Sequence, residues 1–175
     1  MYIVVDVESD GPIPPKYSMV CFGAVAVEPS LSKTFYGKTK PISDLWIPEA
    51  LAISGFSREE HETFDDSKEV MKQFAEWIQQ VSNGKPTFIS DNPAYDFQWI
   101  NYYFHYYLGE NPFGFSARRI GDLYCGLMKN AGVNAEWKRR YRKTRHSHLP
   151  VDDAMGNAEA LIAFRDELGL KIKFE

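Results

Sequence analysis

The chain has 175 residues, of which 44% are hydrophobic and 15% aromatic, which excludes a disordered chain and predicts one domain, residues 1–175, with a substantial core. Its formal net charge of −4 gives no sign of nucleic-acid binding, so any such sign must come from local clusters. No apolar run is long enough to cross a membrane, and two cysteines are too few for a disulfide framework, so we expect a cytoplasmic protein.

The first part of the chain predicts a run of strands. Apolar and β-branched residues predict strands at 2–7, 18–27 and 33–38, and the turn-rich segment SDGPIPPK links the first two. Strands that follow one another so closely favour antiparallel pairing.

The rest of the chain alternates helices with single strands. PEALAI predicts a short helix over 48–53, and apolar residues at helical spacing predict a longer one over 66–81. Four elements follow: a short strand at 87–90, an aromatic-rich helix at 95–108, a short strand at 119–123 that runs into a helix, and a final helix at 152–168. This order predicts a mixed sheet with helices on its faces, an α/β fold.

The first strand ends in two carboxylates, in the stretch VVDVESD. Asp6 and Glu8 are two residues apart, so they point to the same side of the strand. Two adjacent, partly buried carboxylates repel each other unless a cation lies between them, and Mg²⁺ or Mn²⁺ prefers oxygen ligands. The alternative is a solvated strand end with two ordinary surface acids.

Two further clusters contain acids near predicted helix starts. In SDNPAYDFQWI, Asp96 lies among large apolar residues in the first turn of a helix, whereas Asp91 is expected to be a loop or cap residue. In HSHLPVDDAMG, His148 precedes Asp153 by five residues, and Asp153 lies at the start of the final helix. A single histidine near a helix start is commonly structural, and His146 is expected to be solvated.

Segment 130–147 contains a basic run, and six of the eight residues from 138 to 145 are Lys or Arg. We interpret the segment as a surface loop or a frayed helix. Its basic side chains are expected to contact phosphates and its aromatic residues, Trp137 or Tyr141, to stack on bases. The alternative is a solvated charged loop. The predicted contact set is Lys138, Arg139, Arg140, Tyr141 and Arg142.

The chain contains three acidic motifs in a fixed order: D-x-E, then N-x-x-aromatic-D, then H-x₄-D-A. This ordered set resembles the DEDDh exonucleases, which are the DnaQ-like or RNase T-like 3′–5′ exonucleases on the ribonuclease H-like fold. Asp6 and Glu8 match the first motif, Asp96 the second, and His148 and Asp153 the third. The segment IPEALAISGFSREE also resembles the family's linking segment. The proline-rich turn PIPP and the long basic segment depart from the family pattern.

The resemblance implies a ribonuclease H-like α/β fold, a mixed central sheet with helices on both faces. It implies two divalent metal ions, Mg²⁺ or Mn²⁺, and a histidine general base. The implied metal ligands are Asp6, Glu8, Asp96 and Asp153, and the implied base is His148. Ser9 and Asn92 are expected to contact substrate, and Ile13 either wedges against a base or has a plain turn or core role.

We therefore predict a metal-dependent 3′–5′ exonuclease of single-stranded nucleic acid, with RNA favoured over DNA. One alternative is a DNA exonuclease of the proofreading or repair type, and another is a non-catalytic nucleic-acid-binding module on the same fold. We also expect a homodimer, in which the aromatic run 99–107 contributes to the core on one side and to the dimer surface on the other.

Overall fold

The structure is a computed structural model that describes residues 1–174, and its centre is a five-stranded sheet in the order β3-β2-β1-β4-β5. The strands are β1 (Tyr2–Ser9), β2 (Met19–Ala26), β3 (Thr34–Lys38), β4 (Thr87–Ser90) and β5 (Ala117–Arg119). β2 is antiparallel to both β1 and β3, whereas β4 is parallel to β1 and β5. The predicted mixed sheet and its antiparallel start are therefore confirmed.

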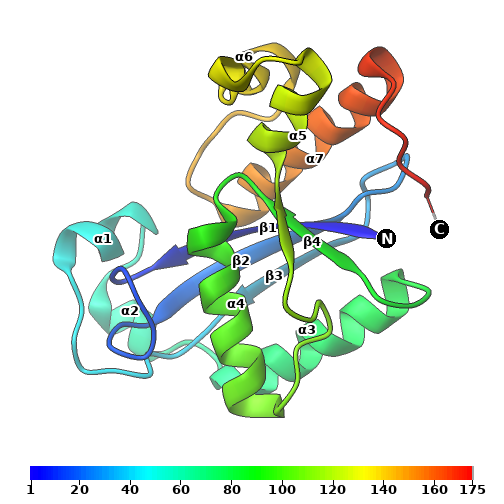
Figure 1. Ribbon diagram of the computed structural model, residues 1–175. Coiled ribbons are helices and arrows are strands. Elements are labelled where there is room, and N and C mark those ends of the chain that lie inside the picture. Colours follow the sequence, from blue (N-terminus) through cyan, green and yellow to red (C-terminus); the bar gives the residue numbers. More distant parts are fainter. Residues whose placement is uncertain (175) are drawn as a thin grey trace.

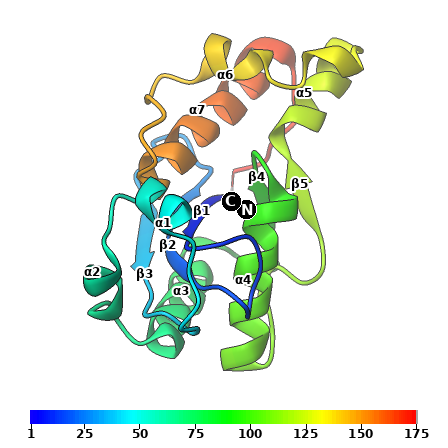
Figure 2. The ribbon, with the colours of Figure 1, turned by 90° about the vertical axis from the view of Figure 1, so that its left-hand side faces the viewer.

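Helices cover both faces of this sheet, as predicted. They are α1 (Pro48–Ile53), α2 (Arg58–Glu62), α3 (Ser67–Val81), α4 (Pro93–Leu108), α5 (Ile120–Met128), the short 3₁₀ turn η1 (Ala131–Val133), α6 (Glu136–Tyr141) and α7 (Pro150–Leu168). α3 and α4 lie on one face, and α5, α6 and α7 lie on the other (Figures 1 and 2). Within residues 1–174, no helix is both long and apolar enough to cross a membrane.

Successive side chains of β1 point to opposite faces of the sheet and therefore pack against different helices. Ile3, Val5 and Val7 pack in the core formed with α3 and α4, whereas Val4 packs in the core formed with α7. Side chains two residues apart share a face. Asp6 and Glu8 (positions 6 and 8) therefore point from the sheet toward the α7 layer.

The aromatic helix α4 has a buried side and an exposed side. Trp99, Tyr103 and Phe104 are fully buried against the sheet and α3, which confirms the predicted core side. On the outer side, the rings of Tyr102 and Tyr106 stack with centroids 5.4 Å apart, and Tyr106 is 66% exposed. This outer side remains the predicted dimer surface.

The strand predicted at 119–123 is wrong, because β5 ends at Arg119 and α5 begins at Ile120. Ile120 and Tyr124 are both buried, and this i, i+4 spacing belongs to a helix that packs on the sheet.

Candidate active site

Four carboxylates meet where β1 ends. A register shift separates Glu8 from Ser9, so regular pairing with β2 stops just after the second acid. One oxygen each from Asp6, Glu8 and Asp153 lie within 4.8 Å of one another. Asp96, in the first turn of α4, accepts a hydrogen bond from the Val7 N–H at 3.3 Å. The structure thus brings all four predicted metal ligands to one place.

A glycine in β2 allows α7 to approach this end of the sheet. Gly23 pairs with Asp6 in the β1–β2 register. A Cβ atom on Gly23 would clash with the backbone of Pro150 and Val151, the first residues of α7. Since any larger residue would push the start of α7 away, Gly23 helps to set the distance between Asp6 and Asp153.

The fold opposes ionisation of these acids. Burial, followed by the charges of Asp96 and Asp153, raises the pKa of Asp6 well above its usual range. Burial and then Asp153 raise the pKa of Glu8 to about 7, and burial also raises the pKa of Asp96. A buried set of mutually repelling carboxylates is stabilised by a cation, and its all-oxygen donors fit a hard divalent metal ion.

His148 stands at the open side of the cluster in an unusual backbone conformation. Its φ of 60° lies in the left-handed region, which is uncommon for a residue other than glycine. Its N–H donates to Asp153 Oδ2 at 3.0 Å, and its Nδ1 lies 3.5 Å from Glu8 Oε1. The imidazole is 51% exposed, so it faces both the carboxylates and solvent. Strained backbone of this kind is concentrated at functional sites.

Residues 142–148, here called the basic strap, are anchored at both ends to α7. Glu159 accepts hydrogen bonds from the N–H groups of Lys143 and Thr144 and from the Thr144 hydroxyl, at 2.7–2.9 Å. The other end is held by the N–H of His148 on Asp153. These anchors fix the path of the strap across the carboxylate cluster.

The strap brings two further side chains to Asp153. Arg142 Nη2 donates to Asp153 Oδ1 at 2.9 Å, and His146 Nδ1 lies 2.6 Å from the same oxygen. A Cβ on Gly156 would clash with Arg142, so this glycine allows the arginine to cross α7. His146 is 56% exposed, which agrees with the prediction that it is solvated, but its pairing with Asp153 was not predicted. The only sequence signal was its position two residues before His148, in HSH.

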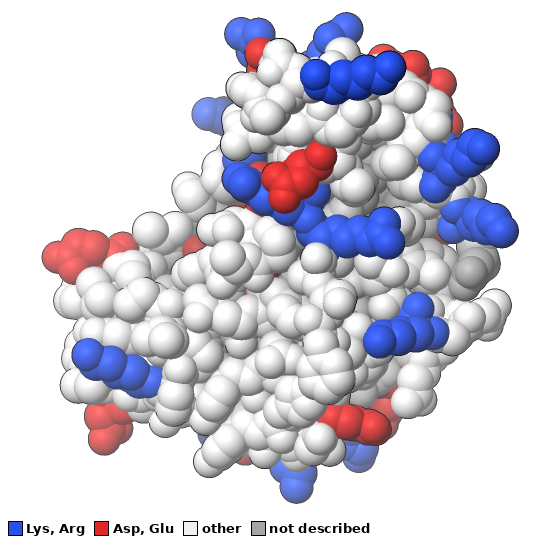
Figure 3. All heavy atoms as spheres, in the orientation of Figure 1, with Lys and Arg blue, Asp and Glu red and all other residues white. Residues whose placement is uncertain are grey.

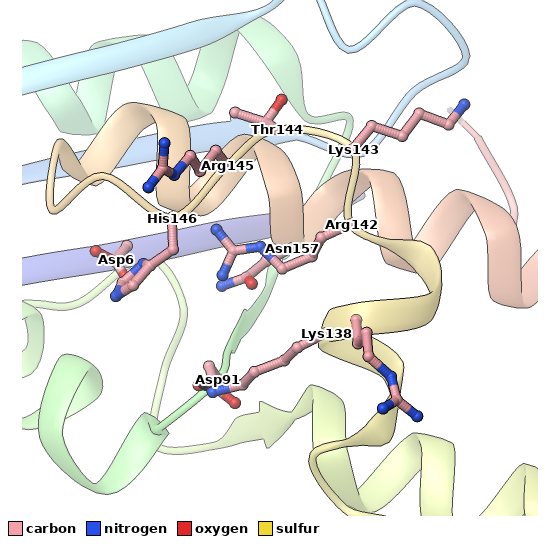
Figure 4. A pocket seen from close by; sticks show the side chains of 10 residues that line it. Asp6, Asp91, Lys138, Arg142, Lys143, Thr144, Arg145, His146 and Asn157 are labelled. Atoms are coloured by element: carbon pink, nitrogen blue, oxygen red, sulfur yellow. Dashed lines mark ion pairs between the residues drawn. The ribbon is translucent and has the colours of Figure 1, made fainter.

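A cavity of about 420 Å³ opens beside Asp6 (Figure 4). Its lining residues are Asp6, Asp91, Lys138, Arg139, Arg142, Lys143, Thr144, Arg145, His146 and Asn157. Lys and Arg side chains gather on the surface over α5, α6 and the strap (Figure 3). Within the cavity, Lys138 forms an ion pair with Asp91. The cavity is therefore a mainly basic hollow that borders the carboxylate cluster.

Asn157 was missed by sequence reasoning. It is 1% exposed, lies one helical turn after Asp153 and borders the cavity, and its Oδ1 has no hydrogen-bond partner among the described residues. The i, i+4 spacing from Asp153 was the signal that could have identified it.

The aromatic residues of the basic segment are core residues. Trp137 and Tyr141 are 0% and 5% exposed, and their rings pack edge-on to Phe164 of α7 at 6.4 and 5.5 Å. The prediction that either stacks on bases is therefore wrong. The guanidinium of Arg140 lies over the Tyr141 ring at 5.5 Å, and Arg140 is outside the set that lines the basic cavity.

The other predicted contact residues differ in their distance from the cluster. Ser9 is buried, donates its hydroxyl to the Gly11 carbonyl at 2.6 Å and lies 2.5 Å from the Tyr95 hydroxyl, so it ties β1 to α4. Asn92 is an exposed residue at the N-terminus of α4. Ile13 is 51% exposed and borders a different cavity, along α4, which contains none of the four acids.

Comparison with known proteins agrees with this geometry. The profile of a family described as "3'-5' exoribonuclease Rv2179c-like domain" matches residues 1–164. A protein of Escherichia coli named "3'-5' DNA exonuclease Cap18" is 41% identical over 165 residues, which cover 92% of this chain and 84% of the relative.

Solved structures share the fold. The nuclease domain of 3'hExo, a DEDDh family member bound to rAMP, superposes with a TM-score of 0.76 at 17% identity, covering 98% of this chain and 95% of that chain. Exonuclease X in complex with 5' overhanging duplex DNA gives a TM-score of 0.66 at 18% identity, with the same coverage. This chain therefore belongs to the Rv2179c-like 3′–5′ exoribonuclease domain family and is a 3′–5′ exonuclease on the ribonuclease H-like fold of the DEDDh enzymes.

Proposed function

We propose that this exonuclease shortens single strands from the 3′ end, with Asp6, Glu8, Asp96 and Asp153 as metal ligands and His148 as the general base. The observation that carries the proposal is the convergence of four carboxylates from three separate elements, at a site where burial opposes their ionisation. Burying repelling charges is costly, and groups with pKa values raised in this way are concentrated at functional sites.

The carboxylates would hold two divalent ions, Mg²⁺ or Mn²⁺, which supply an activated water and stabilise the leaving oxygen. The charges of the other three acids all raise the pKa of Asp6, so Asp6 is the acid whose ionisation would gain most from bound cations. Removing any one acid is then expected to cost activity without unfolding the protein.

His148 would accept the proton of the attacking water. Imidazole is suited to this task because it can take up a proton near neutral pH. With Nδ1 directed at Glu8, Nε2 keeps a lone pair for a proton arriving from the solvent side. The hydrogen bond from its N–H to Asp153 ties the base to the ligand set.

The basic cavity beside Asp6 would bind the phosphates next to the cleaved bond. Its cationic side chains are Lys138, Arg139, Arg142, Lys143 and Arg145. Phosphate contacts of this kind supply affinity without sequence preference and make it depend on salt. Arg140 and Tyr141 do not belong to this set, because neither lines the cavity and Tyr141 is buried against Phe164.

We propose RNA as the first substrate class, on the support of the description of the matched family. DNA is the second candidate, because the 41%-identical relative is named a DNA exonuclease. Contacts to the 2′-hydroxyl are what distinguishes the two strands chemically.

The test is a time course on matched single-stranded RNA and DNA labelled at the 5′ end, with Mg²⁺, with Mn²⁺ and with EDTA. We expect a ladder that shortens from the 3′ end, requires metal and is absent with Asp6→Asn. The faster strand assigns the substrate class. Metal-independent cleavage, or an active Asp6→Asn variant, would refute the proposed site.

We also propose that residues 1–175 act as one domain in the cytoplasm. Cys21 is buried and Cys125 is partly exposed, and both are free thiols, which a reducing compartment maintains.

A further inference from the structure

A second set of possible metal donors overlaps the carboxylate cluster. One ligand atom each from His146, His148 and Asp153 lie within 4.8 Å of one another. The two imidazole rings are 4.4 Å apart and tilted by 61°. Both are about half exposed, whereas Asp153 is 1% exposed, so the two histidines open this set toward solvent.

These donors differ in chemistry from the four carboxylates. Mg²⁺ prefers oxygen ligands, whereas imidazole nitrogen favours Zn²⁺ and the neighbouring late first-row ions. Three protein ligands of the histidine and carboxylate type, with a fourth position open to water, are a common coordination of zinc. The cluster therefore fits a class of ion that the carboxylate set does not select.

The fold holds these donors together before any ion arrives. His146 Nδ1 lies 2.6 Å from Asp153 Oδ1, and the N–H of His148 donates to Asp153 Oδ2 at 3.0 Å. The strap that carries both histidines is fixed to α7 by three hydrogen bonds on Glu159. Because the backbone is anchored, little conformational entropy is lost on binding.

We propose that His146, His148 and Asp153 form a site for zinc-like ions, and that an ion bound there stops the nuclease. The inhibitory part rests on the proposed function, because a bound ion would take the lone pair of the general base and a carboxylate needed by the active ions. His146 would then determine metal selectivity, because Mg²⁺ and Mn²⁺ would bind the carboxylates without binding either imidazole.

Arg142 does not account for the selectivity. Its guanidinium lies 2.9 Å from Asp153 Oδ1 and must leave that oxygen for any cation that binds there. This cost applies equally to hard and soft ions. The nitrogen donors of His146 and His148 are what distinguishes the two kinds of ion.

The test compares His146→Gln with His105→Gln. His105 is an exposed histidine of α4, distant in sequence from the strap, and serves as the control. Exonuclease activity is measured with saturating Mg²⁺ while free Zn²⁺ is raised in a metal buffer. We expect zinc to inhibit the parent and His105→Gln alike. Each rate is expressed relative to the rate of the same protein without zinc, and His146→Gln should need at least about tenfold more zinc for half-inhibition. Equal zinc sensitivity of all three proteins would overturn the proposal.

A binding measurement separates this site from the proposed function. Co²⁺ replaces Zn²⁺ and gives visible absorption typical of low coordination, recorded here with Mg²⁺ present and no nucleic acid. We expect the band in the parent and in His105→Gln, and its loss in His146→Gln and in His148→Gln. If the band shows this dependence on His146 and His148 but the parent protein cleaves neither RNA nor DNA, the metal site is supported and the proposed function is refuted. A band that survives His146→Gln overturns the site whatever the activity.

Discussion

Replacing Glu8 with Gln removes a carboxylate whose ionisation the fold opposes. Burial first, and then the charge of Asp153, raise the pKa of Glu8 from 4.5 to about 7. The folded protein thus holds this proton more tightly than the unfolded chain does. By linkage, the contribution of Glu8 is neutral below pH 4.5 and becomes increasingly unfavourable as the pH rises to about 7.

The size of the effect follows from that pKa. The difference between 4.5 and about 7 corresponds to about 3 kcal/mol for a fully buried group, and solvent screening of this partly buried carboxyl reduces it to about 2 kcal/mol. For a chain of 175 residues, about 2 kcal/mol corresponds to a Tm change of about 4–8 °C. Glu8→Gln should therefore be more stable than the parent by this amount at pH 8 in EDTA, and should lose most of the gain by about pH 5.

The assay is thermal and urea denaturation at both pH values, with EDTA and with Mg²⁺. Glu76→Gln, on the exposed face of α3, is the matched control and should give no pH-dependent gain. With Mg²⁺ the order should reverse, because metal binding stabilises the parent and not the Glu8 variant. If Glu8→Gln is less stable than the parent at pH 8 in EDTA, or if the gap does not change with pH, Glu8 does not belong to a repulsive buried cluster.

Five other substitutions test the site and the core. Asp153→Asn should abolish cleavage with an unchanged circular dichroism spectrum, and near-normal turnover would contradict its role as a ligand. His148→Ala should lower kcat by about 10²–10⁴ and keep Mg²⁺ binding by calorimetry, whereas lost binding would make it a ligand. Trp137→Ala should lower the free energy of unfolding by about 3–5 kcal/mol, and normal stability with weak nucleic-acid binding would argue for a stacking role. Arg139→Gln, in the cavity, should weaken binding and flatten its salt dependence, whereas Arg140→Gln should not; equal effects would exclude the cavity as the phosphate path.

Local periodicity was enough to predict most elements and the core faces. Apolar residues at helical spacing predicted α3, and alternation along the first strand predicted that Asp6 and Glu8 share a face. The same reasoning failed at Trp137 and Tyr141. Four basic residues surround them, and two apolar residues alone are too few to indicate the buried side of a helix. A short helix with such a charged exterior reveals its buried side only when α7 covers it.

The partners of Asp153 were also beyond sequence reasoning. Arg142 and His146 reach it because Glu159 anchors the strap and Gly156 lets the arginine cross α7. Each of these steps depends on a contact between residues that have no fixed spacing in the chain.

The sequence by itself determined the fold class, the order of the acidic motifs and the kind of chemistry, because strand and helix periods and carboxylate chemistry are local properties. The tertiary structure alone decided which nitrogen-bearing side chains accompany those acids. Gly23 sets how closely α7 approaches the sheet, and the anchored strap carries both histidines and Arg142 to Asp153. Distances between elements depend on packing, and packing is established only when the whole chain has folded.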